Sequence, residues 1–511
     1  LPASATTLND LKVLAGDLSI SDDSTLYTEM PVSNISNVDL SNATLTIRKS
    51  QQVNIVDNKL SAAVTTESNE TFLPFTPERY TLIRSDGTTE ELTSDKVQLN
   101  SGSNSLEIFN LGGDDEATLV TTITKIKPKA KNKIKNRVNS IVIDKSVKTA
   151  SGIGSTTLND GLTYGNYPFG TRVQDEHISL NSADLIEVHG IFELATDPSV
   201  NNTDPSAPSM TLANLTGPTA KTSDLVIGES VIGETSGAHA IVAVKETDSK
   251  IAFLPKNQIS FKEGEIVVFE ESEVRASLTT LDTPSKNISF KYTSSNGQNG
   301  EFYDYGVLNR KNNEEAPQRK IIVYFSNGFY ESTDNGDITT VNSYSTFDYT
   351  SEIQSVNNIR NSDIIDIRPK VSDIGSISEG DRSPLEFNGR SFNVSGNSAP
   401  NILASDEGIL TDFSFYLGRI DRVYLTKDGA FQVKYGTPAE NPEKPTSVDD
   451  ALEIATIELP PYLYNVTNAD KKFLEHKRYR MVDINQLEKR IKNLEFFTSL
   501  SLLETNTANL F

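Results

Sequence analysis

Hydrophobic and polar residues alternate in short runs along most of the chain, as they do in strands with one buried face. Such runs include "NATLTIRKS", "RYTLIRSDGTTEEL" and "ATLVTTITK" near the start, and "RKIIVYFSNGFYES" and "RVYLTKDGAFQVKYG" later. Asp86-Gly87 and Lys427-Asp428-Gly429 separate alternating runs, so we expect each to form the turn of a β-hairpin. The pattern predicts a mainly β fold, with several β-sandwich or β-hairpin domains in series.

The hydrophobic period changes near the C-terminus, where "MVDINQLEKRIKNLEFFTSLSLLE" predicts an α-helix over 484–504, with Asp483 as its N-cap. Four apolar residues at a 3-4-3 spacing form what we name the packing stripe: Ile484, Leu487, Ile491 and Leu494. The stripe has two interpretations: it packs on the β domain of its own chain, or it meets copies of itself as a coiled coil. Near the N-terminus, "TTLNDLKVLAG" predicts a short helix that ends at Gly16.

Turn-rich stretches and changes of pattern divide the chain, and the clearest boundary is the linker "TDPSVNNTDPSAPS" at 196–209. The predicted segments are an N-terminal connector (1–30), a β-sandwich-like domain ending in a Lys-rich strand or arm (31–147), an extended β segment and linker (148–209), an inserted tandem β-repeat module (210–282), a β domain (283–400), a β-hairpin domain (401–465), and the helix (466–511), which we expect to continue beyond Phe511.

An internal repeat supports the inserted module. "IGESVIGETSGAHAIV" from Ile227 aligns with "EGEIVVFEESEVRASL" from Glu263, which places Gly228 on Gly264 and Glu229 on Glu265. Two hairpin-like β units that pack face to face would bury the surface that each one alone exposes.

A lysine-rich stretch, "TKIKPKAKNKIKNRVN" at 124–139, interrupts an otherwise acidic chain. Its cations occupy every second position, so in one continuous strand they would all project to the same side. We name them the lysine ladder: Lys125, Lys127, Lys129, Lys131, Lys133, Lys135 and Arg137. The ladder has three interpretations: a protected edge strand, an assembly arm laid on an acidic surface of the same or a neighbouring subunit, or a nucleic-acid-binding strand. The first two are favoured, since the aromatics of single-strand binders are missing.

Composition narrows the function further. The 511 residues contain 47 Lys plus Arg against 70 Asp plus Glu, a net charge of −23, which argues against binding to nucleic acid or to an anionic membrane surface. The chain has no Cys, which excludes disulfides, thiolate metal sites and a cysteine nucleophile. No apolar run reaches the ~20 residues of a membrane helix, so we expect no membrane insertion.

Motifs of catalysis are missing as well. The four histidines, His177, His189, His239 and His476, do not have the spacing of a metal pair, and no nucleophile elbow or phosphate-binding loop is present. We therefore expect no enzymatic activity, no cofactor and no metal site. The lysine ladder and the packing stripe are the candidate functional residues.

Several long blocks resemble a family of phage virion proteins. They include "TTLNDGLTYGNYPFGTRVQDEHISLN", "SNGQNGEFYDYGVLNRK", "TVNSYSTFDYTSEIQSVNNIRNSDIIDIRP", "YLGRIDRVYLTKDGAFQVKYGTPAENPEKP" and "KRYRMVDINQLEKRIKNLEFFTSLSLLE". The resemblance covers about 125–195 and 285–505. The family is the large tail or baseplate structural protein, with a domain of unknown function, of T-even-like myoviruses that infect marine bacteria and cyanobacteria.

The resemblance implies a non-enzymatic structural role in the virion, in the baseplate or fibre-attachment region of a contractile tail. The expected partners are other copies of the chain, with a trimer favoured by tail symmetry, and other tail proteins. A second hypothesis is a receptor-binding module for host surface polysaccharide, suggested by the Asn-, Thr- and Tyr-rich composition. The absence of Trp, the commonest sugar-stacking side chain, weakens this hypothesis.

Overall fold

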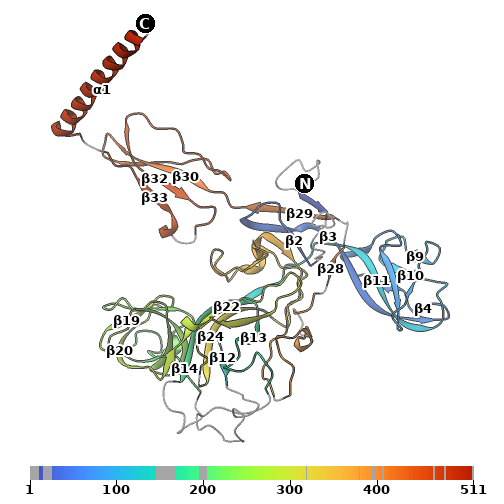
Figure 1. Cartoon of the computed structure of the whole chain (residues 1–511). Coiled ribbons are helices and arrows are strands. Elements are labelled where there is room, and N and C mark those ends of the chain that lie inside the picture. The colour runs from blue at the N-terminus through green and yellow to red at the C-terminus, as the bar shows by residue number, and fades with distance from the viewer. Residues whose placement is uncertain are drawn as a thin grey trace. The chain divides into compact units, whose positions relative to one another are not determined.

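The computed structural model describes residues 11–14, 26–144, 167–194, 204–317, 319–378, 380–393, 397–399, 401–404, 408–463, 466–476 and 479–508. It confirms a mainly β fold with one C-terminal helix in this part of the chain (Figure 1). The chain forms two compact units, Leu1–Tyr416 and Leu417–Phe511. Both hairpin turns predicted from the sequence are present, with φ of 83° at Gly87 and 77° at Gly429.

The largest sheet of the first unit is built on one long strand, β3, whose inward residues are buried, among them Ile35, Leu45 and Ile47. Residues 11–14, predicted as helix, form a strand instead, because they pair with residues 408–411 at the edge of this sheet. The order is β1-β29-β3-β11-β7-β8, and the strands are β1 (Leu11–Leu14), β29 (Gly408–Phe415), β3 (Ile35–Val56), β11 (Asp115–Ile126), β7 (Tyr80–Arg84) and β8 (Thr89–Glu90), with β28 (Ile402–Leu403), β4 (Lys59–Leu60) and β6 (Glu70–Phe72) off this path.

The first unit also contains several small sheets. One has the order β5-β10-β9, and two are strand pairs, β2-β27 and β25-β26. Their bounds are β5 (Val64–Thr65), β10 (Ser105–Ile108), β9 (Val97–Leu99), β2 (Tyr27–Glu29), β27 (Ile364–Asp366), β25 (Ser355–Val356) and β26 (Ile359–Arg360). The β2-β27 pair places Tyr27 opposite Asp366.

The middle of the first unit contains a strand, β24 (Ile321–Tyr330), that is covered on both faces. Val323 and Phe325 pack into one hydrophobic core, whereas Ile322 and Tyr324 pack against a β-barrel formed by residues 209–282. This two-sided burial explains the continuous apolar run "IIVYF". β24 belongs to the sheet β12-β24-β14-β21, and a second sheet has the order β13-β23-β22; the bounds are β12 (Lys133–Ile143), β14 (Leu185–Leu194), β21 (Ser285–Asn287), β13 (His177–Ala183), β23 (Tyr305–Arg310) and β22 (Tyr292–Ser295).

The two sequence repeats lie in a closed six-stranded barrel, to which the chain before and between them also contributes a strand each. Its order is β15 (Ser209–Ala213), β18 (Lys250–Pro255), β17 (His239–Thr247), β16 (Ser230–Gly233), β19 (Ile266–Phe269) and β20 (Arg275–Asp282). Gly228 and Gly264 turn the chain with φ of 84° and 86°. Next to them, Glu229 accepts hydrogen bonds from Ser272 and Glu265 from Ser236, so each repeat donates to the buried carboxylate of the other.

The carboxylate of Glu265 makes barrel stability pH-dependent. Burial alone would raise its pKa, but the backbone N–H groups of Lys262 and Ser236 outweigh burial and hold the pKa below its ordinary 4.5. The stabilisation is therefore complete above about pH 4.5 and is lost as the pH falls through the folded-state pKa.

We expect Glu265→Gln to destabilise the barrel by about 1–3 kcal/mol at pH 7, because four donors then face a neutral amide, and by less at pH 3. Hydrogen exchange of the β16 and β19 amides at both pH values measures this. The control is Glu270→Gln, at an exposed position of the same barrel. A loss that is equal at both pH values would contradict the carboxylate's role.

The second unit contains a sheet in the order β31-β30-β32-β33 and the helix α1 (Met481–Ala508). Arg480 precedes the helix, and its backbone N–H donates to Asp483 Oδ2 at 3.0 Å. Asp483 therefore lies inside the first turn rather than at the predicted N-cap, and the helix starts three residues earlier than predicted. The strands are β31 (Phe431–Lys434), β30 (Arg419–Thr426), β32 (Ala451–Leu459) and β33 (Asp470–Phe473).

Candidate functional site

The lysine ladder does not form one continuous strand, so its cations do not project to one side. Lys125 is the last residue but one of β11 in the large sheet, and Lys133 begins β12, which is an edge strand of a different sheet. Between them Lys127 has a φ of 53°, which breaks the alternation of a strand. As a result Lys125, Lys131 and Lys133 are buried, whereas Lys127 and Lys129 are exposed.

Several ladder cations pair with acidic residues of the same chain. Lys125 Nζ lies 2.7 Å from Asp337 Oδ1 and 3.3 Å from Glu70 Oε1. Further along, Lys135 pairs with Glu352, and Arg137 pairs with Glu271 in the barrel. The ladder thus connects the large sheet, the middle of the first unit and the barrel; its use between subunits stays a prediction.

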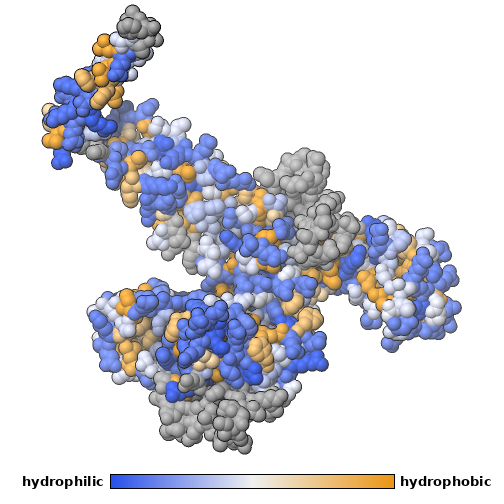
Figure 2. Space-filling model, in the orientation of Figure 1, coloured by the Kyte–Doolittle hydropathy of each residue, from blue (hydrophilic) through white to orange (hydrophobic). Residues whose placement is uncertain are grey.

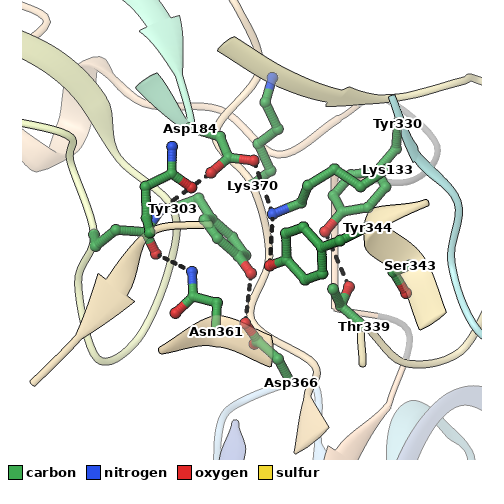
Figure 3. A network of polar contacts seen from close by, with 12 residues as sticks. Lys133, Asp184, Tyr303, Tyr330, Thr339, Ser343, Tyr344, Asn361, Asp366 and Lys370 are labelled. Carbon is green, nitrogen blue, oxygen red and sulfur yellow. Dashed lines mark hydrogen bonds and ion pairs between the residues drawn. The ribbon is translucent and has the colours of Figure 1, made fainter. Parts of the chain in front are cut away.

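Lys133 is the most deeply buried cation of the ladder. Its side chain is 0% exposed, and Nζ lies 2.8 Å from Asp184 Oδ2 and 3.2 Å from the hydroxyl of Tyr344 (Figure 3). The rings of Tyr303 and Tyr344 have their centroids 4.3 and 4.8 Å from Nζ, and that of Tyr330 lies 5.6 Å away. Three aromatic faces and one carboxylate therefore surround the ammonium group.

A second buried ion pair adjoins this cage. Arg368 Nη2 lies 2.7 Å from Asp366 Oδ2, and both side chains are 0% exposed. The hydroxyl of Tyr303 donates to Asp366 Oδ2 at 2.5 Å. The amide groups of Gln298 and Asn361 then connect the two pairs. Gln298 donates to Asp184, Asn361 donates to Gln298, and Arg368 donates to Asn361. We name these residues the buried network: Lys133, Asp184, Gln298, Tyr303, Tyr344, Asn361, Asp366 and Arg368.

The buried network holds its charged groups in their ionised states. Burial alone would lower the pKa of Lys133, but the Asp184 carboxylate outweighs burial and raises it. Burial alone would raise the pKa of Asp366, but the Arg368 guanidinium keeps it lowered. Burial also raises the pKa values of Tyr303 and Tyr344, so both hydroxyls stay neutral. The Tyr303 hydroxyl donates to Asp366, and the Tyr344 hydroxyl accepts from Lys133. These groups are sealed from solvent, so the network fixes structure and offers no place for a substrate.

The sequence contained one signal for this network. Asp366 and Arg368 are two residues apart in "IIDIRP", and such residues share a face in extended chain. Their pairing could have been predicted, whereas the partners of Lys133 lie too far away in the sequence. Across the described residues, no group of three or more His, Asp or Glu is arranged to hold a metal. No described helix is long and apolar enough to cross a membrane.

Three ladder residues line a cavity in the first unit. Lys125, Lys129 and Lys131 contribute to its wall, and its volume is about 690 Å³. The remaining wall comes from Lys49, three carboxylate residues, and small polar residues and glycine: Glu67, Asp334, Asp337, Ser68, Asn69, Asn335, Gly336, Ser398 and Asn401. This volume lies in the range of small-molecule sites, about 300–1,000 Å³.

The packing stripe is exposed. Its four side chains are between 42% and 70% accessible, and Phe496, Phe497, Leu500, Leu502 and Leu503 further along α1 are exposed as well (Figure 2). Of the two interpretations of the stripe, packing on its own β domain is therefore not what the structure shows. The stripe is left available for a partner.

Comparison with known proteins adds one finding. Residues 381–509, which include the sheet of the second unit and α1, match a family described as a domain of unknown function (DUF4815). No curated protein and no solved structure matches the chain. The match covers about a quarter of the chain and assigns no activity.

Proposed function

We propose that this protein is a non-enzymatic structural component of a contractile phage tail, in the baseplate or fibre-attachment region. The long sequence blocks that resemble tail proteins support this role, as does the series of β domains, which makes a stiff scaffold. The partners are copies of the same chain and neighbouring tail proteins, and the protein acts in the virion.

The observation that carries the proposal is the exposed packing stripe. Its residues occupy positions a and d of successive heptads, which places Arg490 at g and Glu495 at the following e. In a parallel, in-register coiled coil, Arg490 of one helix lies beside Glu495 of the next, and opposite charges attract there. Tail symmetry favours a trimer, whereas Ile at position a with Leu at position d favours a two-stranded coiled coil. The measured mass decides how many chains the oligomer contains.

A second apolar face of α1 supports contact with other tail proteins. At about 100° per residue, Phe496, Leu500 and Leu503 lie on roughly the opposite side of the helix from the packing stripe. A bundle held by the stripe leaves this second face on its outside. Neighbouring tail proteins would cover it in the virion.

The test is the solution mass of the purified chain by light scattering, at low and high salt. We expect a discrete oligomer whose mass is the same at low and high salt, because salt screens ion pairs but does not weaken apolar contacts. The double variant Leu487→Glu/Ile491→Glu should be monomeric, because it places charges in the seam. The control Asn485→Glu changes an outward position of the same helix and should leave the mass unchanged. A wild-type monomer, or an oligomer that survives the double variant, would contradict assembly through α1.

A further inference from the structure

We propose that the cavity lined by Lys125, Lys129 and Lys131 binds an acidic saccharide, a sugar ring that carries a carboxylate or a phosphate. Every lining residue is charged, polar or glycine. Such a wall offers nothing to a lipid chain, and it lacks the aromatic faces on which nucleobases stack. The site goes beyond the structural role proposed above and does not depend on it.

The uncharged part of the wall fits sugar hydroxyls. Asn69, Asn401 and Ser398 all line the cavity. Asn69 Nδ2 donates one hydrogen bond to the carbonyl oxygen of Ile126, and Asn401 Nδ2 donates one to Asp337 Oδ1. Each amide has a second N–H, and amide and hydroxyl groups both donate and accept, which is the combination that a sugar hydroxyl requires of its partners. A sugar ring can therefore be held without an aromatic platform.

The carboxylates of the wall are already engaged by the protein. Asp337 accepts from Lys125 Nζ at 2.7 Å and from the backbone N–H of Lys129 at 2.9 Å. Both oxygens of Asp334 accept backbone N–H groups, from Asn132 at 2.8 Å and from Gly336 at 2.9 Å. Asp334 and Asp337 lie in the same loop after β24, and their negative charge is thus used to hold the wall together rather than to attract a cation.

The ammonium groups of Lys129 and Lys131 are what the wall offers a ligand. Lys129 is exposed, and within the part of the chain that the structure describes its ammonium group makes no ion pair. Lys131 is only 4% exposed, and burial lowers its pKa despite nearby Asp334 and Asp366. Lys131 Nζ lies 5.1 Å from the centroid of the Tyr330 ring, and an anion beside the two lysines would add to the stabilisation of its charged form. The pocket therefore favours an anionic ligand although the whole chain carries −23.

Isothermal titration calorimetry of the full chain with four probes tests the proposal. Glucuronate carries a sugar carboxylate and glucose 6-phosphate a sugar phosphate, whereas glucose lacks the charge and inorganic phosphate lacks the sugar. We expect at least one of the two acidic sugars to bind with a Kd on the order of 1 mM, and glucose and inorganic phosphate to bind at least about tenfold more weakly. Whichever acidic sugar binds identifies the charged group.

A matched pair of variants locates the site. Lys129→Glu should weaken the acidic sugar by about tenfold or more, since a charge-assisted contact becomes a repulsion. Lys127→Glu makes the same charge change two residues away, at an exposed residue outside the cavity wall, and should change the Kd less than about twofold. Three results would each overturn the proposal: no binding of either acidic sugar, equal binding of inorganic phosphate, or equal effects of the two variants.

Discussion

Replacement of Lys133 by Met is expected to lower the free energy of unfolding of the first unit by about 3–5 kcal/mol. Methionine fills much of the same volume but leaves the Asp184 carboxylate buried without its ammonium partner. The aromatic cage then surrounds a neutral side chain, and the hydroxyl of Tyr344 loses its donor. Urea denaturation followed by tyrosine fluorescence measures the change, since the chain has 17 Tyr and no Trp.

Two further variants separate the charge from the packing in this prediction. In Lys133→Met/Asp184→Asn the unpaired carboxylate is gone, so we expect much of the lost stability to return. Asparagine suits position 184, where φ is 60°. Lys127→Met, at an exposed ladder position, should stay within about 0.5 kcal/mol of the wild type. If the double variant is no more stable than Lys133→Met, the penalty comes from packing and not from the unpaired charge.

Gly297→Ala is expected to cost roughly 2–4 kcal/mol. Gly297 has a φ of 73°, and a Cβ there would lie against the backbone carbonyl oxygens of Asp304 and Tyr305, 2.6 Å from the second. Backbone atoms cannot rotate away as a side chain can. The loop would have to shift, and with it the next residue, Gln298, which connects the two halves of the buried network.

Gly300→Ala is the matched control for Gly297→Ala. It lies three residues later in the same loop, and a Cβ there would meet nothing within 4 Å. Thermal unfolding should therefore show a clear loss for the first variant and a change within about 0.5 kcal/mol for the second. Equal losses would mean that general stiffening of the loop, and not the close contact at Gly297, is responsible.

The sequence predicts the fold correctly where neighbouring residues alone determine the backbone conformation. Asp86-Gly87 and Asp428-Gly429 form turns because glycine accepts a positive φ, and alternating runs beside them become strands. The prediction at residues 6–16 was wrong where the described part begins, at 11–14. That segment is a strand because it pairs with residues 408–411. The local sequence pattern cannot predict a pairing partner so far along the chain.

The candidate site shows the same division. The lysine ladder stood out because its spacing is regular, but regular spacing does not reveal what each cation contacts. Lys125 pairs with a residue 212 positions later. The ladder also crosses from one sheet to another at Lys127, so the single face expected of one strand is lost. The regular spacing therefore identifies the cations of the ladder but neither their contacts nor their arrangement.

The barrel is connected to the rest of the first unit through two neighbouring points of the chain, so another domain can take its place. Leu194 at the end of β14 pairs with Ser285 in β21, and Ser209 in the first barrel strand lies opposite Asp282 in the last. The chain thus leaves the host sheet and rejoins it at neighbouring points. A different small domain could be grafted between these points without changing the register of the sheet, provided that it covers Ile322 and Tyr324 as the barrel does.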